Sequence, residues 1–411
     1  MSDLPHEILE TIVDQLHNSS LHPFSLVATA FAGPAQARIF RSLHIHVDGR
    51  ARMDYRPMSP WQAQRLFSSS PHLALYVQHL SIEIPPPMRA VDPRIITIPA
   101  RPTQCYPPLQ AVLPSFTRVR RFVLRGPMGR RWAILPPDLK KALRTILLLP
   151  SLQAFVLSGL TVSPALITYA AARVPMLSLF GVNIEPATAS SSSPAADVST
   201  APLQVLALQN VSTSMAAFLS TPGALRTVRD MSITLTDWPV VCTVLRGVAR
   251  TLTHLRFSFS GDQPERRSDS SALPRLYALR LLEVESGASD TPYRLRDLVP
   301  SALPHLDKIV MLVSVTPELR REANWLSRAS GGETAWSHDG RIIDLTGYAG
   351  EIHCRLVIHD YSSVSDPPEA WRELRDKVYE EFVRCMGEQM PAVHETGRLS
   401  FSQEVRYWLR K

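Results

Sequence analysis

Cysteine is scarce in this chain, and the few cysteines lie far apart. Four occur in 411 residues, at Cys105, Cys242, Cys354 and Cys385, and no two of them form a Cys-x-x-Cys pair. This spacing supports neither a disulfide framework nor a zinc knuckle. We therefore expect a protein of a reducing compartment, the cytoplasm or the nucleus or both.

Glycine is also sparse, whereas proline is abundant, with 17 glycines against 35 prolines. Because proline lacks the N–H that helix interiors and central strands donate, this ratio predicts mostly short elements. The chain is 45% hydrophobic and only 20% charged, which allows most of it to bury a core and argues against global disorder.

Signals for a membrane or for secretion are missing. The first residues carry Asp3, Glu7 and Glu10 in place of the basic and apolar segments of a secretory signal. An uncharged stretch runs from Arg144 to Arg173, but two prolines and several polar residues interrupt it. We interpret this stretch as a buried part of the fold and expect no membrane partner.

Motifs for catalysis, cofactors and metals are absent as well. The sequence has no phosphate-binding Gly-x-x-x-x-Gly-Lys loop, no Gly-x-Gly-x-x-Gly turn, no Gly-x-Ser-x-Gly and no His-Glu-x-x-His. A nucleophilic site could be imagined from Cys354 with His353, His359 and Asp360, but no wider signature surrounds them. We expect no enzyme activity, no cofactor and no catalytic or metal site.

What the sequence does contain is an amphipathic helix at its start. Apolar residues recur at helical spacing between Pro5 and Leu16 and fill an arc of roughly 180°, whereas a helix that faces only its own core needs about 100°. Part of this arc could therefore face a second surface, unless the following helices cover all of it. We expect those helices at 24–31 and 35–40, with a break at Gly33 and Pro34, and then a strand at 43–47.

Two histidines of that strand could suggest a metal site. His44 and His46 share its polar side, but no third ligand lies near them in the sequence. We interpret them as exposed strand histidines.

The order of these N-terminal motifs resembles an F-box. The resemblance rests on three motifs, which are the start Leu4-Pro5-x-Glu7-Ile8-Leu9, the segment Phe24-Ser25-Leu26-Val27-Ala28 with Phe31, and the run Arg38-Ile39-Phe40-Arg41-Ser42-Leu43. The resemblance covers residues 1–45 and is to fungal, basidiomycete-type F-box proteins. It implies a three-helix module that docks the adaptor of a cullin ubiquitin ligase, with docking residues Leu4, Pro5, Ile8, Leu9, Ile12, Leu26 and Val27. Many F-boxes have Trp where this chain has Phe31, so the aromatic bulk is kept without the indole donor.

A recurrent sequence pattern follows, in which a Leu-Pro segment precedes a short strand of alternating apolar residues. Examples are 149–157, 273–281 and 303–312, and strand centres lie about 22 to 33 residues apart. Helices at 138–148, 164–172, 214–220 and 240–250 would return the chain. The pattern resembles degenerate leucine-rich repeats, which implies an irregular α/β solenoid over residues 46–365. An irregular α/β sandwich is the alternative.

Two parts of this region read as loops. Dense prolines predict an extended insertion at 85–108, and serine-rich low complexity predicts a mobile loop at 187–198. At the end of the chain we expect a hairpin of 342–345 with 352–358. Residues 366–411 would then form a helical cap, with a helix from Pro367 to Gly387.

A basic cluster also lies in the repeat region, at Arg118, Arg120, Arg121, Arg125, Arg130 and Arg131, with Phe122 and Trp132 between them. It could contact phosphates or acidic protein surfaces, or it could be solvated strand edges and turns. The net charge of +7 is spread along the chain, so a nucleic-acid partner is not favoured.

The resemblance implies a non-catalytic function in protein ubiquitination. The N-terminal helices would bind the ligase adaptor of an SCF-type complex, and the repeats would bind a client protein that the sequence does not identify. The alternative is a repeat-based scaffold for protein interactions, whose F-box-like segment no longer docks a ligase and only caps the solenoid.

Overall fold

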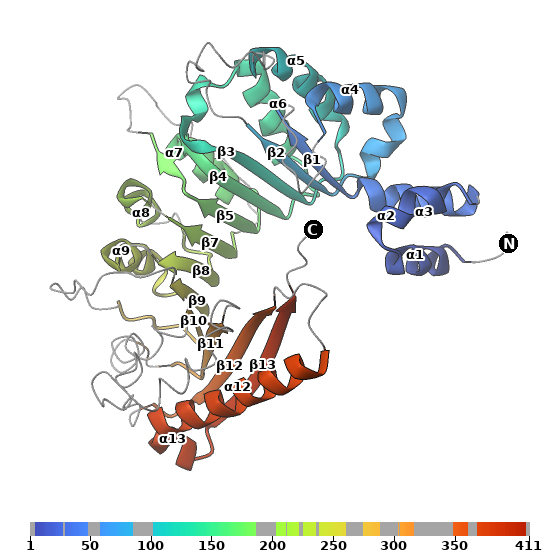
Figure 1. Ribbon diagram of the computed structural model, residues 1–411. Coiled ribbons are helices and arrows are strands. Elements are labelled where there is room, and N and C mark those ends of the chain that lie inside the picture. Colours follow the sequence, from blue (N-terminus) through green and yellow to red (C-terminus); the bar gives the residue numbers. More distant parts are fainter. Residues whose placement is uncertain are drawn as a thin grey trace, which may run out of the picture. The chain divides into compact units, whose positions relative to one another are not determined.

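The chain folds into two compact units, Met1–Leu203 and Gln204–Lys411, each built of parallel strands and helices (Figure 1). This computed structural model describes residues 5–27, 29–47, 58–84, 102–185, 203–210, 212–221, 225–235, 238–259, 274–287, 303, 305–315, 348–360 and 368–407. The predicted α/β class is confirmed. The F-box and leucine-rich-repeat assignments and the domain boundaries stay predictions, and the loop predicted at 187–198 lies outside the described residues.

In the described part of unit 1, helices are interspersed with six strands. Its helices are α1 (His6–Gln15), α2 (Asn18–Ser25), α3 (Thr29–Phe40), α4 (Pro60–Ser69), α5 (Pro102–Val112), α6 (Pro137–Leu147) and α7 (Pro164–Ala171), with short 3-10 helices η1 (Pro71–Tyr76), η2 (Leu113–Ser115) and η3 (Trp132–Ile134). Its strands are β1 (Ser42–His46), β2 (His79–Glu83), β3 (Arg121–Arg131), β4 (Ala154–Val162), β5 (Met176–Phe180) and β6 (Asn183–Ile184).

The first helix is confirmed, but the predicted division of the next two is wrong. Helix α2 is followed by a turn at Leu26 and Val27, and both Gly33 and Pro34 lie inside α3. Pro34 removes only one helical hydrogen bond, and it is buried together with Ala35. Packing therefore outweighs the local cost of this proline.

The proline-rich segment is a second correction. Residues 85–101 lie outside the described part of the chain, but 102–112 form α5 instead of the expected loop. Pro107 and Pro108 both lie within this helix, whose Leu109 and Val112 are buried. Apolar burial again overrides the composition signal.

Strands β1 to β5 of unit 1 pair in sequence order, all in parallel, and β6 pairs with β4. Helices α4, α5 and α6 cover one face of these strands (Figure 1). Alternate side chains such as Leu80, Ile82 and Phe122 are fully buried, and Phe122 stacks on Phe155 with ring centroids 5.4 Å apart. Strand β2 begins only at His79, because Leu75 and Tyr76 belong to η1.

Unit 2 repeats the same arrangement. Its strands are β7 (Val205–Gln209), β8 (Asp230–Leu235), β9 (His254–Phe259), β10 (Leu281–Gly287), β11 (Lys308–Val315), β12 (Glu351–Asp360) and β13 (Leu399–Tyr407), and its helices are α8 (Thr213–Leu219), α9 (Trp238–Val248), α12 (Pro368–Gln389) and α13 (Pro391–Glu395). The strands pair in parallel in sequence order. The four predicted returning helices are confirmed as α6, α7, α8 and α9.

The expected C-terminal hairpin is wrong for its second strand. Both edges of β12 are occupied by parallel neighbours, β11 and β13, so no antiparallel partner can pair with residues 352–358. Residues 342–345 lie outside the described part of the chain. The predicted helix is confirmed as α12, which packs on β13 through Phe382 and Phe401, with ring centroids 6.2 Å apart. The range predicted as a helical cap thus also contains a strand.

Candidate functional site

Helix α1 buries only part of its apolar arc. Leu9 and Val13 are buried, at 7% and 1% exposed, whereas Ile8 and Ile12 are 46% and 37% exposed. Helix α3 packs against α1, and its Arg38 donates a hydrogen bond to the Val13 carbonyl and approaches Asp14. The other side of α1 has no apolar cover from the described residues.

Two more predicted docking residues follow α2. Leu26 and Val27 are 75% and 72% exposed, in the short turn between α2 and α3. Their N–H groups donate to the carbonyls of Pro23 and Phe24, so the backbone is held while the side chains face solvent. A rigid backbone under large exposed side chains lowers the entropy lost when a partner binds.

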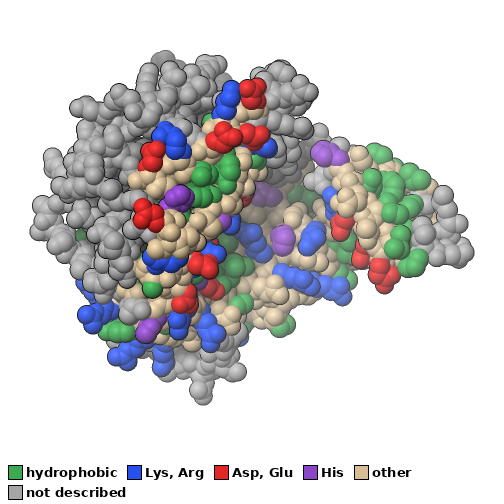
Figure 2. All heavy atoms as spheres, turned by 90° about the horizontal axis from the view of Figure 1, so that it is seen from below, with side chains coloured by type: hydrophobic (Ala, Val, Ile, Leu, Met, Phe, Trp, Pro, Cys, Tyr) green, Lys and Arg blue, Asp and Glu red, His purple; other side chains and the backbone are tan. Residues whose placement is uncertain are grey.

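The seven predicted docking residues therefore divide into three groups. Pro5, Ile8, Ile12, Leu26 and Val27 are exposed; Leu9 belongs to the core; and Leu4 lies outside the described residues. Figure 2 shows hydrophobic side chains gathered over the helical end of unit 1, with acidic side chains beside them. We call Ile8, Ile12, Leu26 and Val27 the apolar patch.

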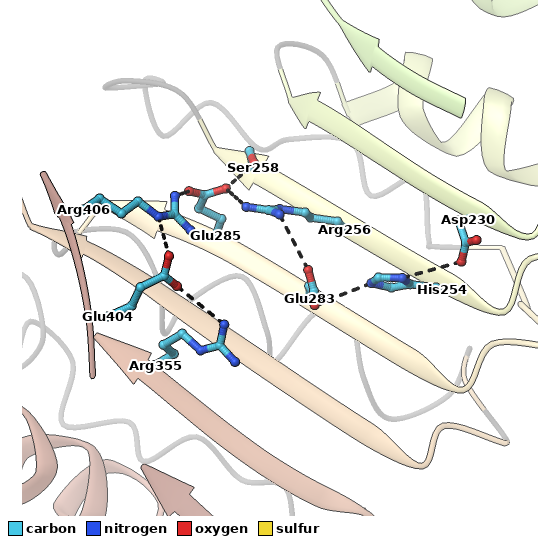
Figure 3. A network of polar contacts seen from close by, with 9 residues as sticks. All are labelled: Asp230, His254, Arg256, Ser258, Glu283, Glu285, Arg355, Glu404 and Arg406. Carbon is cyan, nitrogen blue, oxygen red and sulfur yellow. Dashed lines mark hydrogen bonds and ion pairs between the residues drawn. The ribbon is translucent and has the colours of Figure 1, made fainter. Parts of the chain in front are cut away.

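A second feature, which is polar, lies on one face of the unit 2 strands, where side chains of opposite charge alternate (Figure 3). Parallel register places His254, Glu283 and Arg256 on adjacent strands β9 and β10. The contacts extend from β8 to β13 through Asp230, His254, Glu283, Arg256, Glu285, Ser258, Arg406, Glu404 and Arg355, a set that we call the charge ladder.

The shortest contacts of the charge ladder are hydrogen bonds to Glu285 and Glu404. Arg256 donates to Glu285 at 2.8 Å, and Ser258 donates to the same oxygen at 2.9 Å. Arg406 donates to Glu404 at 2.8 Å. Burial alone would raise the pKa of Glu285, but these hydrogen bonds hold it below its ordinary value.

His254 lies between two carboxylates of the charge ladder. Its Nδ1 is 3.5 Å from Asp230 Oδ1, and its Nε2 is 3.6 Å from Glu283 Oε1, a distance typical of an ion pair and long for a hydrogen bond. The contact with Glu283 raises the pKa of His254 against the opposing effect of burial, and the same contact lowers the pKa of Glu283. Each carboxylate of the ladder faces a cation, so little charge is left to attract a ligand.

Sequence reasoning missed the charge ladder. The signal was present as polar residues of opposite sign at alternate positions, in His254-x-Arg256 on one strand and Glu283-x-Glu285 on the next. Only the parallel register brings these positions together, and that register pairs residues that are 27 positions apart in the sequence.

The two histidines of β1 both contact a carboxylate of the neighbouring strand. His44 and His46 approach opposite oxygens of Glu83, at 3.7 and 3.4 Å. The prediction that both are exposed is wrong for His46, which is 5% exposed. Glu83 lies beside His46 in register, and the backbone N–H of His46 donates to the Met58 carbonyl. No group of three or more side chains that could hold a metal is found within the described ranges.

The alternation of side chains along β12 also separates Cys354 from His353, two groups of the nucleophilic site considered above. Cys354 points into the buried face of β12, with its Sγ 3.9 Å from Met311 Sδ, and burial raises the pKa of its thiol. His353 points to the opposite face, where Ser400 and Ser402 contact its ring nitrogens at 2.9 and 2.8 Å. A buried, protonated thiol facing away from the imidazole cannot act as an activated nucleophile.

The predicted basic cluster is split by the fold. Arg120 and Arg121 lie at the beginning of β3, whereas Arg130 and Arg131 lie at its end, where Arg130 donates to the Tyr106 hydroxyl. The aromatic residues between them, Phe122 and Trp132, are 0% and 4% exposed and offer no ring to a ligand.

Comparisons with known proteins do not add a family. A scan against models of protein families gives no match, and a search among curated proteins gives none either. Within the described helices, none combines the length and the apolar character that crossing a membrane requires.

Proposed function

We propose that this chain is an F-box-type substrate adaptor of an SCF-type cullin ubiquitin ligase. In this proposal the N-terminal helices bind the ligase adaptor, and the region of leucine-rich-repeat-like parallel strands holds a client protein. Ubiquitin transfer would then be promoted by proximity, without a catalytic residue in this chain.

The observation that carries the proposal is the exposure of the apolar patch. Ile8 and Ile12 of α1 and Leu26 and Val27 after α2 leave apolar surface in water, while Leu9 and Val13 of the same helix are buried. Covering such side chains with a partner contributes on the order of 1 kcal/mol for each one that is half to fully exposed. These positions coincide with four of the docking residues that the F-box resemblance implies.

A pull-down with the purified ligase adaptor tests the proposal. The full chain should retain the adaptor, and Ile8→Asp with Leu26→Asp should reduce retention at least about tenfold, because each Asp places a charge in an apolar contact. The matched control is Ile134→Asp with Leu148→Asp, which changes two exposed apolar residues elsewhere in unit 1, 68% and 49% exposed. This control should bind like the unaltered chain.

The rival is a repeat-based interaction scaffold whose N-terminal helices dock nothing. If the folded chain does not retain the adaptor, or if both double variants bind equally well, the rival is favoured and the docking assignment is wrong. Circular dichroism of each variant verifies that the fold is intact.

A further inference from the structure

Four basic side chains of unit 1 gather where its first strands begin. Arg41 and Arg120 each precede a strand, β1 and β3, and the Gln78 backbone between them is hydrogen-bonded to both. One position further on, His79 of β2 lies in register with Ser42 and Arg121. Arg41, His79, Arg120 and Arg121 form what we call the basic edge.

The basic edge is open to solvent. All three arginines are exposed, and His79 is partly exposed with its Nδ1 3.2 Å from the Ser42 hydroxyl. Burial lowers the pKa of His79, and the charges of Arg41, Arg121 and Arg120 lower it further. Parallel pairing places Arg41 and Arg120 at the strand starts on either side of β2, with Arg121 in register with His79.

The described residues place no carboxylate at the basic edge. Among the described residues, no Asp or Glu lies within 4 Å of its three guanidinium groups. On β2 the nearest carboxylate in sequence is Glu83, four residues along from His79 and thus roughly 13 Å away. It is already contacted by His44 and His46.

Arg280 in unit 2, which takes the same position as Arg41, has its charge compensated by a carboxylate. Arg280 precedes β10 as Arg41 precedes β1, with the same backbone hydrogen-bond pattern, and Asp307 lies 3.4 Å from its guanidinium. Lys308 and Glu351 pair similarly one position further on. The starts of β10 and β11 thus supply their own anions, whereas no carboxylate among the described residues pairs with the arginines at the starts of β1 and β3.

We propose that the basic edge binds an acidic, extended peptide segment of a partner protein through at least two Asp or Glu side chains. Arg41 and Arg120 are two strand spacings apart, roughly 10 Å, and carboxylates two or three residues apart on an extended peptide are separated by roughly 7 to 10 Å. The peptide would cross the strand starts, and each carboxylate would accept hydrogen bonds from a guanidinium fork.

The geometry favours a peptide over a nucleic acid. Single-stranded binding sites combine cationic grooves with exposed aromatic rings, but Phe122, the aromatic residue next to Arg121 on β3, is buried. The basic side chains also occupy the starts of three strands and form no long stripe that could follow a phosphate backbone. As the client site of an adaptor this surface rests on the proposed function, but peptide binding can be measured on the chain alone.

Fluorescence anisotropy with the full chain tests the inference. The probe is a labelled peptide of alternating Glu and Ser, and its comparison peptide has Gln in place of Glu. At low salt the acidic peptide should bind and the Gln peptide should not, and added salt should weaken binding because the contacts lie at the surface. The triple variant Arg41→Ser, Arg120→Ser, Arg121→Ser should lose affinity on the order of tenfold or more.

The matched control removes three positive charges at sites away from the basic edge. Arg144→Ser, Arg246→Ser and Arg250→Ser change three exposed arginines of α6, of α9 and of the turn after α9. If this control loses as much affinity as the edge variant, or if the acidic peptide does not bind at all, the inference is overturned. Tighter binding of a single-stranded oligonucleotide with the same dependence on the edge arginines overturns it too. The edge variant should still retain the ligase adaptor, so failure of peptide binding and failure of docking are read separately.

Discussion

At the scale of single residues, burial of polar groups follows from what the neighbouring strand supplies. His46 is buried because Glu83 lies opposite it, and His353 turns from the core toward two serine hydroxyls. Cys354, one residue further, turns into the core beside Met311. The alternation of a strand thus decides which of two adjacent reactive groups meets solvent.

His254 provides a test at this scale. Its contact with Glu283 raises its pKa above the ordinary 6.5, so its stabilising contribution is complete below pH 6.5 and is lost as the pH rises through the raised value. The lowered pKa of Glu283 acts in the other direction, since its contribution is present above pH 4.5 and is lost as the pH falls. Together the pair should stabilise unit 2 most between these two values.

We expect His254→Gln to lower the unfolding temperature at about pH 6 and to have a smaller effect at about pH 8. The difference should correspond to no more than about 1 kcal/mol, because the pair is partly exposed and screened by solvent. Thermal unfolding of both proteins at the two pH values measures it. An equal effect at both values would show that the imidazole is not charged through Glu283.

At the scale of elements, the β3 and β4 pair departs from regular register. The register shifts between Arg125 and Arg130 of β3, opposite Ser158 and Leu160 of β4. Gly159 at this point has a φ of +72°, and a Cβ placed there would overlap the Gly126 carbonyl oxygen. Only glycine allows both the conformation and the close approach.

Gly159→Ala should therefore destabilise unit 1 by roughly 2 to 4 kcal/mol, from left-handed backbone strain plus the backbone overlap. Gly129→Ala is the control, because Gly129 has a φ of +81° but no neighbouring atom within 4 Å of an added Cβ. It should cost only about 1 to 2 kcal/mol. Chemical denaturation compares them, and equal losses would contradict the assigned role of the close approach.

Many elements could be predicted from the sequence because their signals are local. The amphipathic periods of α1, α6 and α9 and the alternation in β1 each identify an element. The errors have tertiary causes. Pro34 and Pro107 are accommodated inside helices because residues next to them are buried in the core. The hairpin was predicted from local pattern, whereas β12 pairs with β13, more than forty residues further along the chain.

The candidate sites were predictable to a smaller degree. The exposed positions Ile8, Ile12, Leu26 and Val27 were named from periodicity and resemblance, but the inward orientation of Leu9 depends on the packing of α3. The charge ladder and the basic edge depend on parallel register between strands that are distant in the sequence. Periodicity within one strand shows its polar face but not which charges will meet there.

At the scale of the whole molecule, the two units differ in how far their surface groups are paired. In unit 2 the open strand face neutralises its own charges, and α12 packs on the last two strands. In unit 1 the helices leave an apolar patch exposed, and the strand starts leave arginines without carboxylates among the described residues. Unmet apolar and ionic surface on the same unit is what an adaptor that joins two proteins requires.

Hydrogen–deuterium exchange of the full chain with and without the ligase adaptor tests the central claim most directly. We expect slower exchange in α1 and around Leu26 and Val27 when the adaptor is present, and unchanged exchange in β3 and in the charge-ladder strands. Protection that appears elsewhere and spares α1, or no protection at saturating adaptor, would contradict the assignment of the N-terminal apolar patch as the docking surface.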